Sequence, residues 1–91
     1  MSDKKIDVTI GSTISVSHES LQLKRHLEKV KWESDGTPFS IDIEGHPAPA
    51  CGAHGNKYEC VSFTFPNPGR YKYSVSSPGK PTLDPDLEII P

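Results

Sequence analysis

The chain has 91 residues, of which 33% are hydrophobic and 24% are charged, and it contains nine prolines and seven glycines. This length predicts one domain, 1–91, with its core at about 6–90, and the proline and glycine content favours strands and turns over long helices. The net charge is −2 with both signs interspersed, so we expect no nucleic-acid binding. No apolar run reaches the roughly 18 residues of a membrane-spanning helix, so we expect no membrane insertion.

Apolar and polar residues alternate through most of the chain, and this period of two predicts half-buried β-strands. The predicted strands are 6–10, 14–16, 21–24, 29–33, 39–44, 60–65, 71–75 and 87–90. The segment 18–30 also has leucines at helical spacing, but the clear strand that follows it favours a short strand and then a turn at 25–28. Many short strands at near-regular spacing predict a sandwich or a barrel.

Turn residues separate these strands. Asp35-Gly36 and the segment Pro66-Asn67-Pro68-Gly69 are strong turn signals. The segment 45–56 has no periodicity and is rich in glycine, proline and histidine, so it is predicted to be a loop. In the strand 60–65, Val61, Phe63 and Phe65 are expected to share one face.

Three short motifs, in this order, resemble the cupredoxin family. They are L-Q-L at 21–23, V-K-W at 30–32 and P-G-R-Y-K-Y at 68–73, followed by a closing apolar strand at 87–90. The resemblance implies an all-β, cupredoxin-like Greek-key β-sandwich of about seven to eight short strands. A tyrosine of the last motif is expected near a corner of the sandwich, with its hydroxyl held against the backbone.

The family's type 1 copper centre uses two histidines, one cysteine and a weak axial methionine. The resemblance places the first histidine after V-x-W, where this chain has Phe39, and the cysteine after Y-x-Y, where it has Val75. The segment 76–86, which would supply the other two ligands, contains neither histidine nor methionine. We therefore predict that Phe39 and Val75 occupy lost copper-ligand positions and close that end of the domain with hydrocarbon.

One cluster of residues has side chains suited to a metal: His46, Cys51, His54 and Cys60, with the spacing H-x4-C-x2-H-x5-C. This order matches no standard zinc-finger pattern. Three interpretations stay open: a Cys51–Cys60 disulfide, a zinc or copper site that uses both cysteines with one or both histidines, or two unpaired thiols on an irregular loop.

The sequence shows no Ser–His–Asp order, nucleophile elbow or metalloprotease helix, so we expect no enzyme. The favoured hypothesis is a cofactor-free, monomeric binding or structural module with an unidentified protein partner. The alternative is a metal-binding protein that holds zinc or copper at the His46–Cys60 loop. The chain would be cytoplasmic if it is native and complete, and periplasmic or secreted if a leader was removed.

Overall fold

Nine β-strands and their connections form the structure, a computed structural model that describes residues 3–91. The strands are β1 (Asp3–Ile10), β2 (Ile14–Val16), β3 (Ser20–Lys24), β4 (Lys29–Ser34), β5 (Ser40–Ile43), β6 (Ala50–His54), β7 (Lys57–Val61), β8 (Gly69–Ser76) and β9 (Asp86–Ile90). Among the described residues, no helix is long and apolar enough to cross a membrane.

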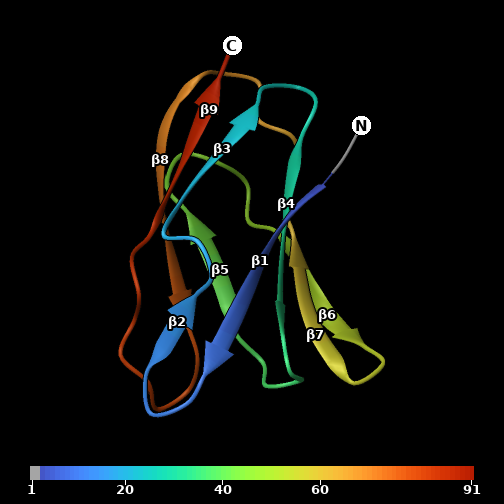
Figure 1. Ribbon diagram of the computed structural model, residues 1–91, viewed down its shortest axis with the longest axis vertical. Helices are drawn as coiled ribbons and strands as arrows, with labels where there is room; N and C mark the ends of the chain where they lie inside the picture. The colour runs from blue at the N-terminus through green and yellow to red at the C-terminus, as the bar shows by residue number, and fades with distance from the viewer. Residues whose placement is uncertain (1–2) are drawn as a thin grey trace.

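The strands form two sheets that face each other, as Figure 1 shows. One sheet has five strands in the order β2-β1-β4-β7-β6, with β1 and β4 parallel and the other pairs antiparallel. The second has four strands in the order β3-β9-β8-β5, with β3 and β9 parallel. The all-β sandwich predicted from the alternation is confirmed, although the structure has nine strands instead of seven or eight.

The core lies between the sheets because alternate side chains of most strands point inward. Trp32 of β4 is fully buried, and its ring lies 5.2 Å from that of Tyr73 on β8 in the opposite sheet. Ile6, Leu23 and Leu87 are also fully buried. Each such side chain contributes ~1.5–3 kcal/mol through burial, so this single interior layer holds the two sheets together.

The predicted loop at 45–56 is wrong in part, because Ala50–His54 forms β6 and pairs with β7 in an antiparallel hairpin. All five β6 side chains are exposed, so the strand leaves no apolar period in the sequence. The predicted strand 60–65 is also misplaced, since β7 ends at Val61. Phe63 is 54% exposed and does not share a buried face with Phe65, which is fully buried.

The predicted turn at Asp35-Gly36 lies against the β6–β7 hairpin. Gly36 has φ +115°, and a Cβ atom placed on it would lie 3.0 Å from the carbonyl oxygen of Asn56. A glycine therefore satisfies two requirements at this position: a backbone conformation that other residues rarely adopt and a close approach between two turns.

Candidate functional site

A shallow pocket of about 410 Å³ lies where the β4–β5 connection meets the end of β8. Its lining consists of three serines, two prolines and one phenylalanine: Pro38, Phe39, Ser40, Ser76, Ser77 and Pro78. Antiparallel pairing of β5 with β8 sets Ser40 directly opposite Ser76, which brings the two halves of the lining together. The pocket is thus built from two segments that are almost 40 residues apart in sequence.

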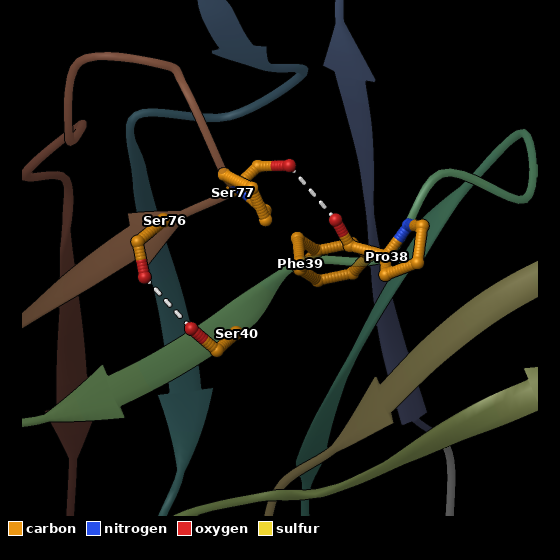
Figure 2. Close-up of a pocket in the computed structure, with 6 residues that line it drawn as sticks. Pro38, Phe39, Ser40, Ser76 and Ser77 are labelled. Carbon is orange, nitrogen blue, oxygen red and sulfur yellow. Dashed lines mark hydrogen bonds between the residues drawn. The ribbon is translucent and has the colours of Figure 1, made fainter.

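Two hydrogen bonds join the two segments that line this pocket, and Figure 2 shows both of them. The hydroxyls of Ser40 and Ser76 lie 2.7 Å apart. The Ser77 hydroxyl donates to the carbonyl oxygen of Pro38 at 2.9 Å. All three hydroxyls therefore already have partners within the protein.

The two positions that were predicted to have lost copper ligands lie in the core at this end of the sandwich. Phe39 is 4% exposed and Val75 is fully buried, and both belong to the same hydrophobic core cluster. The Phe39 ring meets that of Tyr58 on β7 edge-on, with 5.4 Å between their centroids. Because Phe39 comes from the β5 side and Tyr58 from the opposite sheet, this contact covers the end of the core with hydrocarbon.

The donor set at this end does not fit a type 1 copper centre. Such a centre needs two imidazoles and one thiolate in a trigonal plane. The residues that line the pocket offer hydroxyls, hydrocarbon and backbone carbonyls, and Phe39 and Val75 have no atom that binds copper. We therefore assign no copper chemistry to this pocket.

The structure joins Cys51 to Cys60 in a disulfide, which is the first of the three interpretations of the cluster. The two cysteines face each other in the register of β6 and β7. Cys60 is fully buried beneath the sheet, whereas Cys51 is exposed. The disulfide thus anchors an edge strand, which buries none of its own side chains, to a strand that belongs to the core.

The structure does not bring the two histidines of that cluster to the cysteines. His54 is exposed at the end of β6, opposite Lys57. The ring of His46 stacks on Phe65 with 3.9 Å between centroids, and its Nε2 lies 3.4 Å from the carbonyl oxygen of Phe63. Within residues 3–91, no three His, Cys, Asp or Glu side chains form a group that could hold a metal. Metal binding by the reduced chain stays a prediction.

Two of the buried aromatic and imidazole groups have shifted pKa values. Partial burial against Phe65 lowers the pKa of His46 below its usual 6.5, and the nearby Phe63 carbonyl opposes this shift. Burial raises the pKa of Tyr73 to about 12; the indole N–H of Trp32 opposes this and the Asp86 carboxylate adds to it. The Trp32 and Tyr73 polar atoms nevertheless fall short of hydrogen-bond geometry, so both are buried without a partner among the described residues.

No protein-family model matches the chain, and no curated protein matches it. Among solved structures, it is similar to a multicopper oxidase, with a TM-score of 0.58 and 15% identity over 97% of this chain. The fold is cupredoxin-like. The chain spans 44% of the length of that oxidase, and at this identity the likeness shows the fold and nothing of activity.

A cysteine protease inhibitor from Entamoeba histolytica also aligns, with a TM-score of 0.47 and 12% identity over 97% of this chain and 95% of that chain.

The sequence predicted that Phe39 and Val75 close this end of the sandwich with hydrocarbon, and both are buried, but it missed the serines of the pocket. Ser40 and Ser76 each follow one of the two lost ligand positions by a single residue, and Ser77 follows Val75 by two. The available signal for these serines was therefore their position next to Phe39 and Val75 in the chain. Serine gives no signal of its own, because isolated serines are common in exposed strands and turns.

Proposed function

We propose that this protein is a non-catalytic binding module on a cupredoxin-like fold, and that it contacts a protein partner at the pocket between Pro38 and Pro78. The observation that carries the proposal is the chemistry at this end of the sandwich. Buried Phe39 and Val75 stand where the family's ligands are expected, and Phe39 also lines a pocket with apolar and hydroxyl walls.

The same geometry argues against catalysis at the pocket. A serine nucleophile needs an adjacent base, most often an imidazole, that accepts its proton. Ser40 and Ser76 are bonded to each other, and Ser77 is bonded to a backbone carbonyl. Among the residues that the structure describes, no titratable side chain lines the pocket, so none of these hydroxyls has a lining base beside it.

The pocket walls instead suit an uncharged side chain of a partner. The rings of Pro38 and Pro78 are exposed at its rim, whereas Phe39 forms its buried floor. Rigid apolar surface with a few fixed polar groups is typical of recognition sites, because little conformational entropy is lost when a partner binds. The two hydrogen bonds across the pocket keep both walls in place.

Cross-linking in the native source tests this function with the wild-type chain and two variants. Ser40→Arg places a large charged side chain in the pocket, and Ser15→Arg adds the same side chain to an exposed position on β2 in the other sheet. We expect one specific cross-linked partner with the wild type and with Ser15→Arg, in the presence of EDTA, and its loss with Ser40→Arg.

Two outcomes would contradict the proposal. If Ser40→Arg, shown to be folded by its melting temperature, keeps the partner, the pocket is not the binding site. If EDTA abolishes the interaction and elemental analysis finds stoichiometric zinc or copper, the metal-binding alternative is correct instead.

A further inference from the structure

One edge of the five-stranded sheet is open along β6. The strand β6 pairs with β7 on one side only, and it is the last strand in the sheet order, as seen at the edge of the sandwich in Figure 1. An unpaired edge strand presents backbone N–H and C=O groups to its surroundings and is a template for another strand.

The hydrogen-bond pattern shows which backbone groups face outward. The N–H of Ser62, just after β7, donates to the carbonyl oxygen of Val30 on β4 at 2.9 Å. Every second residue of β7, Cys60 among them, therefore directs its N–H and C=O to β4. Cys60 therefore does not bond to Cys51 through the backbone, in keeping with their Cα separation of 4.0 Å. By the same alternation, Cys51 and Ala53 direct their N–H and C=O groups away from β7, to the open edge.

The β6 edge also lacks the features that usually block such pairing, which are charged side chains, proline and irregular backbone within the strand. Its sequence is Ala-Cys-Gly-Ala-His, and the Cys51–Cys60 disulfide holds it in an extended conformation. The other open edges differ: β2 has three residues, β3 ends in Lys24, and β5 has Asp42 among its four residues. Among these four terminal strands of the described sheets, only β6 combines length, neutrality and small side chains.

We propose that β6 pairs with β6 of a second copy of this chain, antiparallel about a two-fold axis at Gly52. In this register Cys51 of one copy lies opposite Ala53 of the other, and each of these two pairs exchanges two hydrogen bonds. All four outward groups of each copy are then satisfied. This proposed dimer differs from the monomer that was expected from the sequence.

Steric and charge considerations favour this register and this occupant. Gly52 meets its own copy on the axis, and its lack of a side chain suits a close approach there. A Cβ placed on Gly52 would have no atom of the same chain within 4 Å, so nothing in that chain covers this position. In this register His54 faces Ala50, so the two histidines of the dimer do not face each other. The cavities of about 410, 450 and 230 Å³ are lined by residues outside β6, so none of these three could select the side chain of a foreign peptide at this edge.

Four hydrogen bonds between two short strands make a small interface, so the dimer is weak and reversible. Sedimentation equilibrium from micromolar to millimolar protein tests it. We expect the average mass to rise from 10.0 kDa towards twice that value. Ala53→Pro removes one outward N–H, which an edge position tolerates, and should stay at the monomer mass; Ala53→Val, the matched control at the same position, keeps the N–H and should associate.

A second measurement needs no variant. The amides of Cys51 and Ala53 should exchange with solvent rapidly in dilute protein and about tenfold more slowly at millimolar concentration, because only the dimer protects them. A monomer mass at every concentration with unchanged exchange overturns the proposal. So does association that a folded Ala53→Pro retains, because a different surface then holds the two copies together.

Discussion

Breaking the disulfide at Cys51 should lower the free energy of unfolding by about 2.5 kcal/mol. Cys51→Ser is the cleanest change, because Cys51 is exposed and the buried Cys60 keeps its volume in the core. The nine-residue separation of the two cysteines sets the magnitude, since the chain-entropy relation gives ~2.5 kcal/mol for a loop of this length. In a domain of this size that loss corresponds to a fall of roughly 10–20 °C in the melting temperature.

Urea and thermal unfolding of wild type and Cys51→Ser, each with and without a phosphine reductant, measure the effect. The reductant should lower the stability of the wild type to that of Cys51→Ser and leave the variant unchanged. The serine itself should matter little, because exposed substitutions usually change stability by less than about 0.5 kcal/mol.

A difference below about 0.5 kcal/mol between oxidised wild type and Cys51→Ser would refute this reasoning. It would mean that closing this loop does not lower the entropy of the unfolded chain by the expected amount, or that the two cysteines are not joined in the protein. Thiol titration under denaturing conditions distinguishes these cases, since a joined pair yields free thiols only after reduction.

Three further variants test the buried groups and the tight turn. Partial burial lowers the pKa of His46, so below about pH 6.5 the unfolded chain binds a proton at this histidine more readily than the folded chain does. The free energy of unfolding should therefore fall as the pH falls from about 7 to about 5. Urea unfolding at these two pH values should show a smaller fall for His46→Phe than for the wild type. Burial raises the pKa of Tyr73 to about 12, so stability should fall as the pH rises from about 10 to about 12, and Tyr73→Phe should reduce that fall. The variant should cost less than about 1 kcal/mol at neutral pH, because the Tyr73 hydroxyl has no hydrogen-bond partner among the described residues. Gly36→Ala should lower the free energy of unfolding by about 1–3 kcal/mol in the same urea assay, because a φ of +115° is combined with a 3.0 Å approach of the new Cβ to the Asn56 carbonyl oxygen. A loss below about 0.5 kcal/mol would show that the turn relaxes freely.

Alternation predicted the strands that bury one face and failed where no face is buried. Ile41 and Ile43 mark β5 because they enter the core between exposed Ser40 and Asp42. The strand β6 exists through backbone pairing and a disulfide alone, and these contribute no hydrophobic period. Periodicity is therefore informative only about side chains that fold against a second layer.

The misplaced strand at 60–65 has a different cause. Val61, Phe63 and Phe65 alternate in the sequence, but the strand ends at Val61 and the chain then crosses towards β8. The hydroxyl of Ser62 accepts a hydrogen bond from the N–H of Val30 at 3.0 Å. Ser62 is therefore buried and its neighbour Phe63 is exposed, the reverse of what the alternation predicts for these two residues. A polar residue that is buried for a backbone hydrogen bond cannot be recognised from apolar alternation.

The tyrosine motif was predicted correctly in kind, and the structure decides which tyrosine has the role. Tyr71 donates its hydroxyl to the carbonyl of Asn67, four residues upstream, at 3.2 Å, as expected for a sandwich corner. Tyr73 lies two residues later on the same inward face, but its ring packs against Trp32 and its hydroxyl has no hydrogen-bond partner within residues 3–91. The spacing defines the inward face, whereas the position of the preceding turn determines which hydroxyl reaches the backbone.

Phe39 and Val75, the two positions that the resemblance matches to copper ligands, lie at an end of the sandwich that hydrogen bonds help to hold together. The start of β5 is joined to the end of β8 there through Ser40 with Ser76 and Ser77 with Pro38. Hydrogen bonds of this kind contribute about 0.5–1.5 kcal/mol each, and the burial of Phe39 and Val75 adds to them. The pocket walls are thus fixed by contacts that are independent of any metal, and this is why we expect binding at the pocket to persist in EDTA.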